Sequence, residues 1–216
     1  MDLQFEDEVS IPSGKVELKG ELIVPVDAKA IVIFSHGSGS SRHSPRNKMV
    51  AHYLNKKHIA TLLFDLLTVE EDLNYENRFN IPLLAERLKD ASRWIISNPV
   101  TSDCRIGYFG ASTGAASALI AAAGMEEAGA VVSRGGRPDL AGAALPKVKA
   151  PTLLLIGSRD PEVIELNKYA FNRLGGEKKM EIIPGATHLF EEPGTLEKVC
   201  ELAYEWFDTW LIQSTP

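Results

Sequence analysis

The chain has 216 residues, 44% of them apolar, so it can bury a substantial core and gives no reason to expect a second domain. We therefore predict a single domain over residues 1–216. The 23 basic residues are outnumbered by 29 acidic ones, and a formal charge of −6 offers no general attraction to a phosphate backbone. Nucleic acid is thus excluded as an expected partner.

The cysteines and the amino terminus narrow the class further. Cys104 and Cys200 lie far apart and outside any CxxC or Cys/His pattern, so neither a disulfide framework nor a zinc site is indicated. The first ten residues are rich in Asp and Glu, unlike a secretory signal. No apolar stretch approaches the roughly 20 residues needed to cross a bilayer. We expect a soluble, cytoplasmic protein without a membrane partner, and the sequence leaves its oligomeric state open.

Short apolar runs alternate with helical patterns along the chain. Val16, Leu18 and Leu22 alternate like strand residues near the start. Six further runs are predicted strands: residues 30–34, 59–64, 105–109, 130–133, 152–156 and 180–183. Several of them are apolar at consecutive positions, which is typical of strands buried on both faces of a parallel sheet.

Three amphipathic patterns predict helices between and after these strands. Ser44 and Pro45 form an N-cap and first-turn pair that opens the first helix. A second helix is predicted over residues 81–97 and a last one over residues 195–211, each with one apolar stripe. The alternation favours an α/β domain with ligands at the carboxyl ends of its strands. Residues 68–80 are the most polar stretch, which we interpret as a solvated loop.

A serine lies in a turn between a predicted strand and a predicted helix. The turn is Gly110-Ala111-Ser112-Thr113-Gly114, and the residues after it are mostly alanine. The GxSxG spacing is typical of a sharp turn that exposes a nucleophilic serine, because glycines avoid collisions there. The helix start favours negative charge, so the backbone N–H of Thr113 is a predicted oxyanion donor. The alternative is a chance match in a chain with 17 glycines.

A nucleophilic serine needs a base, and His188 is the best placed of the five histidines. It follows the last predicted strand and precedes the last predicted helix, so its loop can reach Ser112. The alternative is a loop histidine satisfied by backbone groups. His52 and His58 lie at the amino end of the strand at 59–64, and we predict that both are surface residues.

The acid that orients the base is predicted to be Asp160. It follows the apolar run at 152–156, at a strand end between Ser112 and His188 in the sequence. An Asp before Pro also commonly starts a turn or caps a helix. Asp139 and Asp65 follow other strands and are competing carboxylates, although either can instead anchor a loop.

A second glycine-containing loop follows the strand at 30–34. Its small residues allow backbone N–H groups to point at a ligand, and we predict that Ser38, flanked by Gly37 and Gly39, supplies the second oxyanion donor. His36 is predicted to brace this loop through side-chain hydrogen bonds. The phosphate-binding patterns GxxxxGK[ST] and GxGxxG are both absent, so a nucleotide cofactor is not indicated.

Several loop residues are expected around the site. Arg42, His43 and Arg46 add positive charge, which fits either an anionic substrate or ordinary solvation. The segment 133–138, with Arg134, either joins the rim of the site or forms a glycine turn with solvated arginines. The predicted pocket walls are Leu66, Leu67 and Phe190.

Together these motifs resemble the α/β-hydrolase superfamily over nearly the whole chain. The order Ser112, Asp160, His188, with a His-Gly loop after an early strand and GxSxG after a later one, matches that superfamily. Residues 36–47, 134–139 and 187–192 resemble the dienelactone hydrolase-like branch of small bacterial serine hydrolases. The resemblance implies an α/β-hydrolase fold, with a mostly parallel central sheet and helices on both faces. Residues 138–150 leave no room for a lid domain, so we expect an open site.

The implied function is a serine hydrolase of small ester-like substrates, meaning carboxylic esters, lactones or thioesters. It would act through an acyl-enzyme with a triad of Ser112, His188 and Asp160, and it would require no metal or organic cofactor. Dienelactone hydrolases proper use a cysteine nucleophile, whereas this chain has Ser112, so their substrate does not transfer. Two alternatives stay open: a non-catalytic binding or scaffold protein with the same fold, and an acyltransferase.

Overall fold

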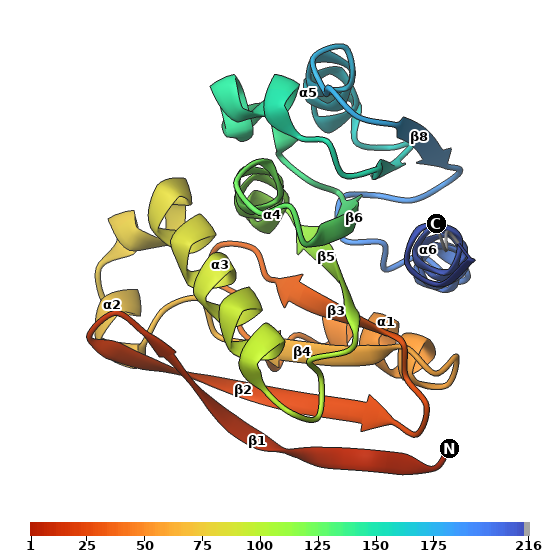
Figure 1. The fold of residues 1–216 in the computed structure, drawn as a ribbon. Helices are drawn as coiled ribbons and strands as arrows, with labels where there is room; N and C mark the ends of the chain where they lie inside the picture. The colour runs from red at the N-terminus through yellow and green to blue at the C-terminus, as the bar shows by residue number, and fades with distance from the viewer. Residues whose placement is uncertain (214–216) are drawn as a thin grey trace.

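A computed structural model describes residues 1–213 of the chain and shows one eight-stranded sheet in the order β1-β2-β4-β3-β5-β6-β7-β8 (Figure 1). The strands are β1 (Leu3–Ser13), β2 (Val16–Pro25), β3 (Ala30–Ser35), β4 (Ala60–Phe64), β5 (Arg105–Ala111), β6 (Ala128–Arg134), β7 (Thr152–Gly157) and β8 (Lys178–Ile183). From β4 to β8 every neighbouring pair is parallel, whereas β1 and β2 pair antiparallel and β2 joins β4 antiparallel. The mostly parallel sheet predicted from the sequence is confirmed.

Helices cover both faces of this sheet, as predicted. The helical segments are α1 (Pro45–Asn55), α2 (Val69–Asp72), η1 (Tyr75–Phe79), α3 (Ile81–Ser97), α4 (Thr113–Ala123), η2 (Pro138–Lys147), α5 (Pro161–Phe171), α6 (Thr195–Phe207) and η3 (Asp208–Gln213). In Figure 1, α3, α4 and α5 lie on one side of the sheet, and α1 and α6 lie on the other. The chain therefore forms three layers, with the sheet in the middle.

Two hydrophobic clusters lie against the two faces of the sheet. One joins the sheet to α3, α4, α5 and η2, and the other joins it to α1 and α6. The central strand β3 is buried at every position, which explains its unbroken apolar run. α4 is built mainly from alanine and glycine, so it packs closely on the sheet beside α3 and η2.

The edge strand β1 was not predicted from the sequence. It is an amphipathic strand in which acidic residues cover the solvent side, while Val9 is half-buried and Ile11 and Ser13 are buried. Charged side chains are typical of an exposed sheet edge, because they discourage pairing with another chain. The acidic composition that argued against a signal peptide is thus the composition of an edge strand.

Two further predictions, one of a loop and one of a helix, also need correction. Residues 68–80 are not a plain loop, because α2 is opened by a capping box between Thr68 and Glu71, and η1 follows it. The segment is largely exposed, as a solvated stretch should be. The last α-helix ends at Phe207, and a single π-helical segment continues to Gln213. The other main elements, α3 above all, have the predicted positions.

The sheet brings the predicted functional residues together at the carboxyl ends of its parallel strands. Parallel strands have their carboxyl ends on the same side, and the loops after β3, β5, β6, β7 and β8 all leave from that side. The connection after β6 is the short segment η2, so the described residues place no lid domain there. Within residues 1–213, no helix has both the length and the apolar character required to span a bilayer.

Candidate active site

Ser112 is held in a strained turn between β5 and α4. Its φ is 52° and its ψ is −123°, a backbone conformation that residues other than glycine rarely adopt. Its backbone N–H donates to Arg134 O (3.3 Å), and its carbonyl accepts from Arg137 N–H (2.9 Å). The turn is therefore fixed by the neighbouring β6 loop, and the surrounding contacts hold the serine in this conformation.

The glycines of the GxSxG motif are required by close packing. A Cβ on Gly114 would lie 2.1 Å from Ser35 O, and one on Gly110 would lie 2.5 Å from the Cα of Ala115. Both neighbours are backbone atoms, which cannot rotate away as a side chain can. The match is thus no accident of glycine content, because this strand-to-helix turn leaves no space for a larger residue.

His188 and Asp160 form a hydrogen-bonded pair at the same edge. His188 Nδ1 lies 2.7 Å from Asp160 Oδ2, and the side chains are 40% and 16% exposed. A carboxylate only accepts hydrogen bonds, so Nδ1 carries the proton and Nε2 of the neutral ring is an acceptor. The loops that carry the pair are joined, because Arg159 N–H donates to Ala186 O (2.9 Å).

The two competing carboxylates are occupied elsewhere. Asp139 accepts two hydrogen bonds of 2.9 Å from Arg137. Asp65 accepts from the Arg42 backbone N–H (2.8 Å) and forms an ion pair with the Arg42 guanidinium. Each anchors a loop, which was the alternative role considered for both. His52 and His58 are exposed, as predicted.

Ser112 and His188 line one cavity of about 200 Å³. The other residues that line it are Gly37, Ser38, Ser40, Ser44, Arg46, Asn47, Ala111, Arg134, Gly135 and Leu189. The predicted walls were wrong, since Leu66 and Phe190 are buried in the two cores and Leu67 lines neighbouring cavities. Leu189 is the apolar residue that takes their place. It adjoins His188 in the sequence, and this was the available signal.

The loop after β3 approaches Ser112 closely. A Cβ on Gly37 would lie 3.0 Å from the Ser112 Cβ, so glycine is needed for this approach. The next residue, Ser38, donates its backbone N–H to Thr113 Oγ1 (2.9 Å). The two predicted oxyanion donors thus belong to residues in direct contact, and the Ser38 N–H is bonded to the Thr113 hydroxyl.

His36 braces this loop as predicted. Its Nδ1 lies 2.9 Å from Gly37 O, and its Nε2 accepts the Leu66 N–H at 3.1 Å. These two bonds require a neutral ring with the proton on Nδ1. Burial lowers the pKa of His36 below its usual 6.5, against the opposing effects of the Gly37 bond and of Asp65 and Asp72.

The basic residues around the cavity differ in their surroundings. Arg42 forms ion pairs with Asp65 and Glu8, Arg46 forms one with Glu191, and His43 is exposed. Arg134 lines the cavity, in line with the first of its two sequence-based interpretations, and it is buried rather than solvated, with 6% of its surface exposed. Burial, with a smaller effect of Arg46, lowers its pKa to about 10, so it remains charged at neutral pH. The only sequence signal for this burial was its place at the end of an apolar strand.

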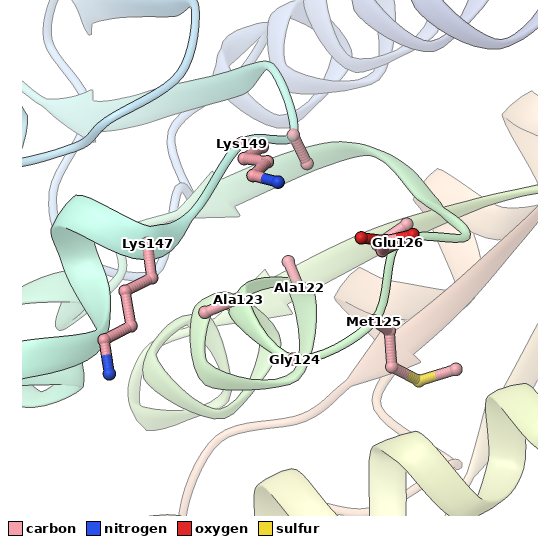
Figure 2. A pocket seen from close by; sticks show the side chains of 9 residues that line it. Ala122, Ala123, Gly124, Met125, Glu126, Lys147 and Lys149 are labelled. Carbon is pink, nitrogen blue, oxygen red and sulfur yellow. The ribbon is translucent and has the colours of Figure 1, made fainter.

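A second cavity, of about 310 Å³, lies at the opposite edge of the sheet (Figure 2). Lys147 reaches it from the end of η2, Lys149 from the segment between η2 and β7, and Met125 and Glu126 from the loop after α4. It holds no serine, histidine or cysteine, and its lysines are exposed, so it offers no nucleophile and base pair. Among residues 1–213, no group of three or more His, Cys, Asp or Glu side chains is placed to hold a metal ion.

Comparison with known proteins identifies the family of this fold. A family model described as an alpha/beta hydrolase domain matches residues 28–203. Two curated proteins of Mycobacterium tuberculosis, from strains CDC 1551 and H37Rv, are each 55% identical over 203 residues and are provisionally named phosphoribosyl transferases. The match covers 94% of this chain and 46% of each relative, so the chain spans about half the length of these relatives.

Solved structures show the same fold. A crystal structure of a dienelactone hydrolase from Anabaena variabilis ATCC 29413 is 54% identical, with a TM-score of 0.94, and the match covers 98% of this chain and 100% of that one. Est1E from Butyrivibrio proteoclasticus is 18% identical, with a TM-score of 0.79 over 94% of this chain and 98% of its own. The second likeness supports the fold alone.

Proposed function

Because the chain belongs to the α/β-hydrolase family and is of the dienelactone hydrolase type, we propose that it is a serine hydrolase that cleaves small ester-like substrates. One observation carries the proposal. His188 is hydrogen-bonded to Asp160 at 2.7 Å, and it lines the same cavity as the strained Ser112. A serine, an oriented base and a partly buried acid are the parts that acyl transfer requires.

The proposed reaction begins when His188 Nε2 takes the hydroxyl proton of Ser112 as its Oγ attacks the substrate carbonyl. Asp160 holds the ring and stabilises the imidazolium that forms. The tetrahedral oxyanion accepts a hydrogen bond from the Thr113 backbone N–H at the start of α4. The Ser38 N–H joins it by exchanging its bond to Thr113 Oγ1 for one to the oxyanion.

Collapse of this intermediate breaks the bond to the leaving group, which receives the proton from His188. An acyl-Ser112 ester remains. A water molecule then gives a proton to His188 and adds to the acyl carbon. The bond from this carbon to Ser112 Oγ breaks, His188 returns the proton to Oγ, and the acid is released. The open cavity of about 200 Å³ suits a small acyl group.

The names of the relatives do not identify the substrate of this chain. The nucleophile here is a serine, which argues against carrying over the dienelactone reaction from the cysteine enzymes. The phosphoribosyl transferase name belongs to proteins of which this chain matches 46%. The substrates that we propose are therefore carboxylic esters, lactones and thioesters as a class.

The test is covalent labelling of the nucleophile followed by turnover. A fluorophosphonate probe should label the wild-type protein and Ser97→Ala, a control at the exposed end of α3, but not Ser112→Ala. Release of p-nitrophenol from p-nitrophenyl butyrate should fall on the order of 10⁶-fold in Ser112→Ala. Folded wild-type protein that neither reacts with the probe nor cleaves any ester would exclude the proposal.

The same assays separate the two alternative functions. A binding or scaffold protein with this fold would bind ligands without steady release of p-nitrophenol. An acyltransferase would divide the acyl group between water and an added alcohol or amine, so the product ratio would change with acceptor concentration. If the free acid is the only acyl product at every acceptor concentration, the result supports hydrolysis.

A further inference from the structure

Arg134 has a buried guanidinium without an acidic partner in the wall of the Ser112 cavity. The residue is 6% exposed, and its Nε has no hydrogen-bond partner. Its Nη2 makes one long bond of 3.4 Å to Asn47 Oδ1. Across residues 1–213, no carboxylate lies within ion-pair distance of Arg134.

A buried cation of this kind is costly unless something compensates it. The Phe190 ring, 5.8 Å from the guanidinium carbon, gives a weak favourable contact. Arg46 lies close enough to lower the pKa of Arg134 further, although the group stays protonated at neutral pH. The fold thus maintains two neighbouring positive charges at one side of the nucleophile without a protein counter-ion for the inner one.

The remaining lining of the cavity favours the same sign of ligand. Ser44 is the N-cap of α1, an 11-residue helix whose amino end carries partial positive charge, and Asn47 belongs to its first turn. None of the residues that line this cavity is acidic. Arg46 pairs with the 64% exposed side chain of Glu191, a surface bond that an incoming anion can replace.

We propose that Arg134, together with Arg46 and Asn47, binds an anionic group on the acyl part of the substrate, a carboxylate or a phosphate. This inference rests on the proposed hydrolase function, because it names the substrate class of the same site. A guanidinium donates several hydrogen bonds from one planar group, which fits the oxygens of either anion.

The charge is placed on the acyl part for a geometric reason. Arg134 is a buried part of the cavity wall, whereas the leaving group must depart to solvent after the first step. The acyl part stays attached to Ser112 inside the same cavity of about 200 Å³. A group that remains bound through both steps is the one that a fixed, buried cation can hold.

The first measurement compares matched substrates with wild-type protein. We expect kcat/KM for p-nitrophenyl hemisuccinate or p-nitrophenyl 3-phosphonopropionate to exceed that for the neutral methyl ester of p-nitrophenyl succinate by at least about tenfold. The two anionic arms show whether carboxylate or phosphate is preferred. Equal rates for all three esters, or a preference for the neutral one, would overturn the proposal whatever the variants do.

The second measurement assigns the preference to Arg134. In Arg134→Met the ratio of anionic to neutral kcat/KM should fall at least about tenfold, and Arg134→Lys should retain part of it. The control Arg173→Gln removes an exposed arginine that stacks on Tyr169, beyond α5, and should keep the wild-type ratio. A wild-type ratio in Arg134→Met would refute the assignment.

A binding experiment keeps this inference separate from the proposed function and does not depend on turnover. Ser112→Ala protein is titrated calorimetrically with succinate and with inorganic phosphate, and the double variant with Arg134→Lys serves as the comparison. Saturable binding that weakens at least about tenfold in the double variant supports the anion site even if no ester is cleaved. Ester cleavage without binding of either anion and without selectivity leaves the hydrolase standing and removes the anion site.

Discussion

The reactivity proposed for Ser112 depends on backbone geometry that its own side chain disfavours. At φ 52° the serine stands between β5 and α4, and hydrogen bonds to the β6 loop hold it there. The same turn places the Thr113 N–H at the first position of α4. Strain at this residue and the proposed oxyanion donor beside it therefore come from one local conformation.

In the hydrogen-bonded pair of His188 and Asp160, the variant Asp160→Asn should lose most activity and keep the fold intact. The amide can hold His188 through its N–H₂ group in the wrong tautomer, which leaves a protonated Nε2 unable to accept the serine proton. We expect kcat for p-nitrophenyl butyrate to fall on the order of 10⁴-fold. Asp139→Asn, which alters the carboxylate bound to Arg137, is the control and should keep wild-type kcat. Equal losses in both variants would assign the effect to charge rather than to ring orientation.

His36 predicts a pH dependence of stability. Burial lowers its folded-state pKa below 6.5, so the unfolded chain binds the proton more readily. Stability from the neutral ring is thus fully present above pH 6.5 and is lost as the pH falls from 6.5 towards the lower folded-state pKa. The melting temperature should decrease over this range, and it should decrease less in His36→Gln. Parallel curves for the two proteins, followed by circular dichroism, would contradict this role.

At the scale of single residues, chain order and motif indicated where the candidate residues lie, and their catalytic roles stay predictions. GxSxG located the turn, and strand ends located Asp160 and His188, which the structure joins. The state of Arg134 was not accessible in this way, because whether an arginine at a strand end is solvated or buried depends on Asn47 and Phe190, residues from distant segments. The Ser38 bond to Thr113 is equally non-local.

The turn between β5 and α4 packs closely against the end of β3 and the loop that follows it. Adding a single methyl group at this contact tests how tightly these elements are fitted. In Gly114→Ala the added Cβ would meet Ser35 O at 2.1 Å, and both groups are backbone-anchored. We expect a loss of about 3 kcal/mol or more in the free energy of unfolding, measured by urea titration. Gly124→Ala is the control, because the atoms nearest to its Cβ, at 3.3 Å, belong to the flexible Lys89 side chain, and it should change stability by less than about 1 kcal/mol. A similar small change in both variants would show that the turn can relax.

Element prediction depended on how clearly each segment showed its period. α3 has a continuous apolar stripe between an Asn80 cap and residue 97, and its predicted limits are those observed. β1 was missed because its inner face is only partly buried and carries Asp7 among its apolar residues. α2 and η1 were missed because they are short and bury no residue, so capping rather than hydrophobic period defines them.

For the whole molecule, the buried thiol of Cys200 should report global unfolding. The residue has no exposed surface in the cluster between α6 and the sheet, and burial raises its pKa to about 12. In Cys104→Ala protein, reaction with an aromatic disulfide reagent should be slow in buffer and complete in urea, with a midpoint equal to that from circular dichroism. Fast reaction of the native protein would show that α6 opens independently of the rest.

The overall architecture was the part most accessible from sequence. Consecutive apolar residues indicate buried strands, and the alternation of these strands with helices restricts the topology to a few parallel arrangements. The antiparallel β1–β2 hairpin lay outside this reasoning, because an edge hairpin is exposed on one side and has no crossover helix. Nothing in the strand pattern alone gives the size of a cavity, since that depends on side chains from several loops.

The parallel sheet also determines when the site can exist during folding. Ser112, Asp160 and His188 follow β5, β7 and β8, so none of them acquires its partners from a local hairpin. The cavity is complete only after long-range strand pairing has closed, which is the slow part of forming a parallel sheet. We therefore expect the proposed activity to be acquired late, so that during refolding its return should lag behind the return of the helical signal.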